Sequence, residues 1–117
     1  MFILTVIFAV VTAAVFAFAG YYKVSGAEQQ MDEARHLGVE WPAYRLLGGA
    51  ELLGALGLLI GLWLSWLGVI AAFCLVALAA GALIVHAKAG DRLDAMRPAI
   101  GFGALALATL VLRLITV

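Results

Sequence analysis

The sequence predicts an all-α membrane protein whose four transmembrane helices form an antiparallel bundle, with a short amphipathic interfacial helix between spans one and two. The chain is 67% hydrophobic and 12% charged, with a mean hydropathy of +1.16. A soluble domain is about half apolar and about a quarter charged. Four stretches reach the roughly 20 apolar residues that one crossing of a bilayer requires. The length favours one membrane domain, residues 1–117.

The expected spans are residues 2–21, 44–62, 66–86 and 98–116. The first stretch ends like a signal peptide, with small residues before Gly20. It lacks a positively charged start, however, and its apolar run is long for a cleaved signal. We therefore interpret it as a retained span.

Two kinds of residue mark the ends of the spans. Pro42 and Pro98 lie at or just before the starts of the second and fourth spans. Proline is tolerated there because the first N–H groups of a helix lack intrahelical partners. Aromatic side chains concentrate at both membrane interfaces. Those that flank the connections are Tyr21, Tyr22, Trp41, Tyr44, Trp63 and Trp66.

The first connection predicts a short amphipathic helix over residues 27–37. Ser25 and Glu28 have the spacing of a capping box, which marks a helix start. An apolar stripe at helical spacing follows, and Gly38 is suited to the position just after a helix end. Such a helix lies at the membrane surface with its apolar face toward lipid. The alternative is a solvated loop.

Lysine and arginine predict the orientation. One base, Arg113, lies near the C-terminus, and the other six lie in or beside the first and third connections. Cytoplasmic loops carry the excess of bases. We therefore expect these two connections in the cytoplasm and both termini outside. The six bases are Lys23, Arg35, Arg45, Lys88, Arg92 and Arg97.

Glu51 is the residue that most needs explaining, because an acid within a span is costly and often functional. It lies about 10 Å into the second span, and helical side chains lean toward the helix N-terminus. Its carboxylate is therefore expected near Lys23, Arg45 and His86, which lie close to the same interface. These four residues predict a polar intramembrane site. It is either a ligand-binding site or a structural clamp between spans.

Three further features carry expectations about packing. Arg113 is expected to reach out to the outer interface. Cys74, the single cysteine, cannot form an intrachain disulfide and is expected to be a small buried core residue. Small residues along one side of spans two and four let helices approach closely and are compatible with a homo-oligomer. They are Ala50, Gly54, Gly57, Gly61, Gly101, Ala104 and Ala108.

Several function classes leave no trace in the sequence. His36 and His86 are 50 positions apart and lack metal-ligand spacing. There is neither a phosphate-binding glycine loop nor a nucleophile elbow. No basic stripe suggests nucleic acid. We predict no catalytic residue, no metal and no nucleic-acid partner, which favours a non-enzymatic role.

Three segments together resemble the DoxX-like family of small four-helix membrane proteins. They are FAGYYKVSG at the end of span one, LLGGAELLGALGLLIG in span two and VHAKAGD at the end of span three. The resemblance covers nearly the whole chain. This chain departs from the family pattern after span two, where many relatives carry a proline and this chain has Gly61, Leu62 and Trp63.

The resemblance implies a bundle in a bacterial cytoplasmic membrane, with Lys23, Glu51 and His86 at the family's recurrent polar positions. The family takes its name from a subunit linked to thiosulfate–quinone oxidation, and other members are associated with oxidative-stress proteins.

Three functions are compatible with these features. The first is a non-enzymatic membrane subunit or scaffold that binds protein partners through its cytoplasmic connections. The second is a redox accessory that holds a quinone, or a lipid, in the polar site. The third is a proton-coupled small-molecule transporter, since small multidrug resistance proteins share this length and have a key intramembrane glutamate. There, however, the acid lies in the first span, whereas Glu51 lies in the second.

Overall fold

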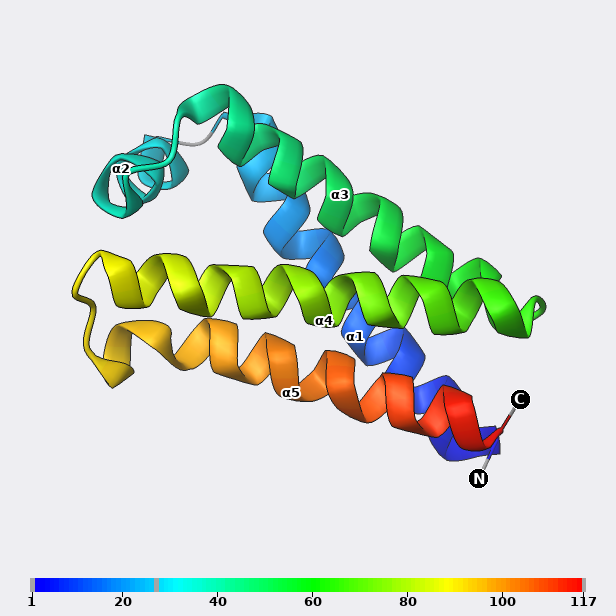
Figure 1. The fold of residues 1–117 in the computed structure, drawn as a ribbon. Helices are drawn as coiled ribbons and strands as arrows, with labels where there is room; N and C mark the ends of the chain where they lie inside the picture. Colours follow the sequence, from blue (N-terminus) through cyan, green and yellow to red (C-terminus); the bar gives the residue numbers. More distant parts are fainter. Residues whose placement is uncertain (1, 27, 117) are drawn as a thin grey trace.

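The computed structural model describes residues 2–26 and 28–116, with side chains at all of these except 93–95. This part of the chain forms the helices labelled in Figure 1. Four of them are long and apolar enough to cross a membrane, which confirms the predicted bundle of four spans. The helices are α1 (Phe2–Ser25), α2 (Glu28–Leu37), α3 (Trp41–Ile60), α4 (Ser65–Lys88) and α5 (Leu93–Ile115).

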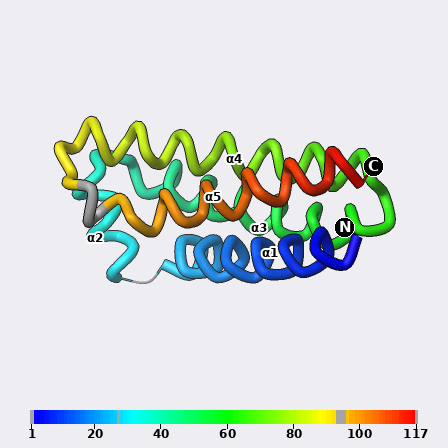
Figure 2. Tube along the Cα trace, turned by 90° about the horizontal axis from the view of Figure 1, so that it is seen from below, coloured from blue at the N-terminus to red at the C-terminus, as the bar shows by residue number. Residues whose placement is uncertain are grey.

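The long helices form a ring in which α1 packs on α3, α3 on α4, α4 on α5 and α5 on α1. Both termini lie at one end of the bundle, and α2 lies at the other end beside the α4–α5 connection (Figures 1 and 2). In Figure 1, α3 and α4 meet near their shared turn and diverge toward α2. The bundle is therefore closed at the end with the termini and open at the α2 end.

The predicted short helix forms, but its start differs from the prediction. Ser25 is the last residue of α1, and its hydroxyl donates to the carbonyl of Tyr22 at 3.0 Å. The capping-box interpretation of Ser25 is therefore wrong. The end is as predicted: Gly38 has φ +72°, and Val39 N–H donates to Ala34 O at 2.9 Å. This is the Schellman pattern, in which a left-handed residue lets the chain bond back to the last turn.

Glycines set the α3–α4 contact. A methyl group added at Gly54 would lie 2.5 Å from the Leu75 side chain, and one added at Gly61 would lie 2.3 Å from the Gly68 backbone. The predicted small-residue side of span two therefore packs on α4. The corresponding side of span four does not face the bundle, because Gly101 is exposed and has open space around it.

Threonines join α1 to α5. Thr109 donates its hydroxyl to the carbonyl of Leu105 at 2.8 Å, and Thr12 donates to Thr109 Oγ1, also at 2.8 Å. Both threonines are fully buried. Hydrogen bonds of this kind hold helices together where lipid offers no partner. Composition and hydropathy gave no sign of this contact, because threonine occurs on any face of an apolar helix.

Arg113 does not reach the outer interface as predicted. It is 2% exposed, and its Nη2 donates to the carbonyl of Gly61 at 3.0 Å. The last carbonyls of a helix lack intrahelical partners, so an arginine there satisfies one and complements the helix dipole. Gly68 makes space for the Arg113 side chain, because a methyl group at Gly68 would lie 2.9 Å from Arg113 Nε.

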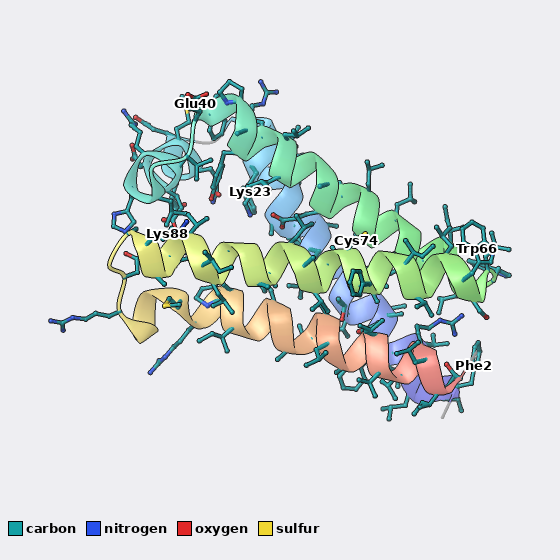
Figure 3. The ribbon with its side chains drawn as sticks, in the orientation of Figure 1. Phe2, Lys23, Glu40, Trp66, Cys74 and Lys88 are labelled. Atoms are coloured by element: carbon teal, nitrogen blue, oxygen red, sulfur yellow. The ribbon has the colours of Figure 1, made fainter. Side chains whose placement is uncertain are left out.

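Two smaller predictions also need correction. Cys74 is exposed on the outer side of α4 and is not a core residue (Figure 3). A thiol is apolar enough for a surface that faces lipid. Helix α5 begins at Leu93, so Pro98 lies inside the helix instead of at its start.

Substitution of Gly54 by leucine should destabilise the protein by about 1–3 kcal/mol, because the new side chain would overlap Leu75. Thermal unfolding in detergent measures the change. Gly49→Leu is the matched control, since Gly49 lies on the same helix with open space beside it. Equal stability of the two variants would contradict the close α3–α4 contact.

Candidate functional site

A cavity of about 730 Å³ lies between the diverging helices at the α2 end. Its walls come from α1, α3, α4 and α5, and α2 lies over it. Most of the lining is apolar, including Phe16, Phe18, Leu78 and Phe102. A smaller polar group of lining residues consists of Tyr22, Lys23, Gln29, Gln30, Glu33, Tyr44, Glu51 and His86.

Glu51 and Lys23 form an ion pair in this cavity, with Lys23 Nζ 2.9 Å from Glu51 Oε1. The two side chains are 9% and 17% exposed, respectively. Lys23 Nζ also lies 5.5 Å from the centroid of the Tyr44 ring, within the range of a cation–π contact. In Figure 3, Lys23 lies in the space bounded by α2, α3 and α4. The ion pair thus joins α1 to α3 at the polar part of the cavity.

Two glycines bring these charges together. A methyl group at Gly20 would lie 2.5 Å from Gly48 O, and one at Gly48 would lie 2.6 Å from Lys23 Cβ. The backbones of α1 and α3 therefore touch beside the ion pair. Side chains lean toward the N-terminus of their own helix. Because the two helices are antiparallel, Lys23 leans deeper into the bundle and Glu51 leans toward α2, so the two groups meet.

His86 lines the same cavity but bonds to a different acid. Its Nδ1 donates to Asp91 Oδ2 at 2.6 Å. The backbone explains the pairing: Gly90 has φ +76°, and Asp91 N–H donates to His86 O at 3.1 Å. This second Schellman pattern places the residue after the glycine against the residue five positions earlier. Residues at these two positions are usually apolar, whereas here they are an acid and a histidine.

The same carboxylate holds α2 in place. His36 Nε2 donates to Asp91 Oδ1 at 2.5 Å, so Asp91 bridges the histidines of α2 and α4. Glu33, also on α2, lies 4.0 Å from His86 Nε2. On the other side, Tyr44 donates its hydroxyl to Gln30 Oε1 at 3.1 Å. Polar contacts therefore attach α2 to both α3 and the end of α4.

The predicted site residues thus fall into three positions. Lys23 and Glu51 are in contact, and His86 shares their cavity while it bonds to Asp91. Arg45 is exposed on α3 and is not among the lining residues. Sequence reasoning missed Asp91, although the order histidine, three residues, glycine, aspartate carries the signal of a Schellman turn.

Comparison with known families adds one finding. The family model described as the DoxX-like family matches residues 7–109, which is most of the chain. The chain belongs to the DoxX-like family. No curated protein and no solved structure matches it. The family match and four spanning helices make this DoxX-like chain a small, multi-pass integral membrane protein.

Two groups outside the spans of this DoxX-like protein have shifted pKa values. The hydrogen bond to Asp91, with the attraction of its charge, raises the pKa of His36 above its ordinary value of 6.5. Hydrogen bonds from His36 and His86 lower the pKa of Asp91 below 3.8. The His36–Asp91 ion pair therefore persists to a higher pH than an isolated histidine would allow, and to a lower pH than an isolated aspartate would allow.

A double-mutant cycle should show that Lys23 and Glu51 act as one unit. Lys23→Met and Glu51→Gln should each destabilise the protein, with a coupling of about 0.5–2 kcal/mol in unfolding. Glu51→Ala should cost more than Glu51→Gln, because the amide keeps its hydrogen-bonding capacity. Arg45→Met is the control and should be additive with Glu51→Gln. If the effects of Lys23→Met and Glu51→Gln were also additive, the contact between Lys23 and Glu51 would not contribute to stability.

A pH above the raised pKa of His36 should loosen α2. A raised histidine pKa contributes stability that is complete below pH 6.5 and is lost as the pH rises through the raised value. The lowered pKa of Asp91 contributes stability above 3.8 that is lost as the pH falls through the lowered value. Spin labels at Glu28 and Arg92, in a protein with Cys74→Ala, should show a broader distance distribution above the pKa of His36.

The variant His36→Gln provides the control for this pH effect, because glutamine does not titrate. Its distance distribution should not change over the pH range in which that of the wild-type sequence broadens. An equal change in both proteins would assign the pH effect to another group.

Proposed function

We propose that this DoxX-like protein is a non-enzymatic membrane subunit that binds a neutral, lipid-soluble amphiphile in the cavity beneath α2. The observation that carries the proposal is an apolar cavity of about 730 Å³ with an ion pair at its polar part. Small-molecule sites in proteins have volumes of roughly 300–1,000 Å³ and combine apolar walls with a few placed polar groups. The cavity meets both criteria.

Charge and position restrict the ligand. Lys23 and Glu51 neutralise each other, so a ligand with a net charge would add an uncompensated charge to an apolar environment. The cavity lies between helices that span the membrane, so a molecule dissolved in lipid can reach it. The polar end of the molecule would lie against the ion pair and its tail against residues such as Phe16 and Phe102.

A quinone fits this description. Its ring and tail suit the apolar walls, and Lys23 has N–H groups beyond the one that faces Glu51, so it can donate to a ring carbonyl. When bound, a quinone supplies two-electron redox chemistry. The residues described here would hold and orient it, and the role of the subunit would be that of a redox accessory.

Filling the cavity should abolish binding. Gly81 lines the cavity and has open space beside it, so Gly81→Phe should fold and place its ring in the ligand volume. Gly101→Phe is the matched control, because Gly101 also has open space but is not a lining residue. Mass spectrometry of extracts from purified protein should find an amphiphile retained by the wild type and the control. Retention by Gly81→Phe should fall at least tenfold.

Two results would contradict this proposal. One is the absence of a retained small molecule from the wild type. The other is equal retention by Gly81→Phe and Gly101→Phe, which would place the molecule on the outer surface.

A scaffold role is the second candidate, and the exposed side of α2 favours it. Asp32 and Arg35 form an ion pair there with side chains 65% and 73% exposed, respectively. A stoichiometric protein that co-purifies with the wild type, and is lost when both residues are replaced by alanine, would support this role.

We also propose that α2 and the α4–α5 connection face the cytoplasm, because six of the seven bases lie at or near this end. A cysteine placed at Asp91 should not react with a reagent confined to the outside of the cell. Labelling only from the outside would show that the opposite orientation is correct.

A further inference from the structure

One oxygen of Glu51 is left without a hydrogen-bond partner. Within residues 2–26 and 28–116, Oε1 bonds to Lys23, whereas Oε2 is buried and has no partner. The side chain is 9% exposed, and Glu51 lines the cavity. A buried acceptor without a donor costs about 1–3 kcal/mol, and more when it is charged. Because Glu51 lines the cavity, a small rotation of its carboxylate would bring this unsatisfied acceptor to a bound molecule.

The ion pair determines which of its atoms remain available. Lys23 Nζ donates to Glu51 Oε1 at 2.9 Å and has further N–H groups that can donate to a ligand. A group beside the pair can thus donate to Glu51 Oε2 and accept from Lys23. A hydroxyl group does both. A carbonyl or an ether can accept from Lys23, but it would leave Oε2 unsatisfied and exclude water from it.

We propose that Glu51 selects a ligand whose polar end carries a hydroxyl donor, and that it binds the same molecule less tightly when that hydroxyl is converted to an ether or a carbonyl. The ligand class is a neutral amphiphile with a hydroxylated head, such as an alkylphenol or a quinol. This inference rests on the proposed function, since it requires the cavity beneath α2 to bind an amphiphile. Oxidised quinones, which bear only acceptors on the ring carbonyls, would bind more weakly than their reduced forms.

The variant Glu51→Gln gives a sharp test because it is nearly isosteric. Lys23 can only donate, so the amide oxygen would face Lys23 and the amide nitrogen would take the place of Oε2. The acceptor at that position would become a donor. The variant should therefore lose the preference for the hydroxylated ligand or reverse it in favour of the ether.

The probes are 4-nonylphenol and its methyl ether, 4-nonylanisole, added at equal mole fractions to nanodiscs that contain the purified protein. Binding is read from the rise in Tm as the mole fraction of the probe increases. The wild type should bind the phenol about tenfold more tightly than the ether. Glu51→Gln should lose or reverse that preference, and Gly81→Phe should bind neither probe.

The outcomes separate the inference from the proposed function. Equal binding of both probes by the wild type, abolished by Gly81→Phe, would overturn the selection by Glu51 and leave the cavity as a binding site. A preference for phenol that persists in Glu51→Gln would also overturn it. Binding of neither probe to the wild type would overturn the inference and the proposed function together. The wild-type comparison stands even if Glu51→Gln fails to fold.

Discussion

The contact between the backbones of α1 and α3 at Gly20 and Gly48 is the constraint on which the site depends. With no side chain at either position, the helices approach closely enough for Lys23 and Glu51 to pair one turn away. A single charge at this depth would be costly, whereas a paired acid and base satisfy each other. Here α3 rests on α1 and diverges from α4, and the cavity at this end is lined by residues of α1, α2, α3, α4 and α5.

Polar side chains have different roles at the two ends of the bundle. At the closed end they complete the packing: Thr12 bonds to Thr109, and Arg113 bonds to the carbonyl of Gly61. At the open end they attach α2 to the rest of the bundle, since His36 bonds to Asp91 just after α4. The contacts at the closed end hold the long helices together, and the contacts at the open end position α2.

Two Schellman turns shape the open end. The turn at Gly38 ends α2 and directs the chain into α3, and the turn at Gly90 places Asp91 against His86. A left-handed glycine has no steric cost, so each turn reverses the chain within a few residues. In this member of the DoxX-like family, the second turn also supplies the carboxylate that α2 binds. Local backbone geometry at Gly90 thus links α2, which covers the cavity, to α4, which forms part of its wall.

The sequence by itself determined the class, the four spans, the short helix and its end at Gly38, because hydropathy, length and turn chemistry are local properties. It also indicated that Glu51 lies near Lys23, since depth in a membrane can be counted along each helix. Only the tertiary structure decided which face of each helix points inward. Arg113 and Cys74 were misplaced for that reason: on helices apolar all round, no period in the sequence marks the buried side. The cavity likewise depends on the divergence of α3 from α4, a property of packing between helices that no single segment encodes.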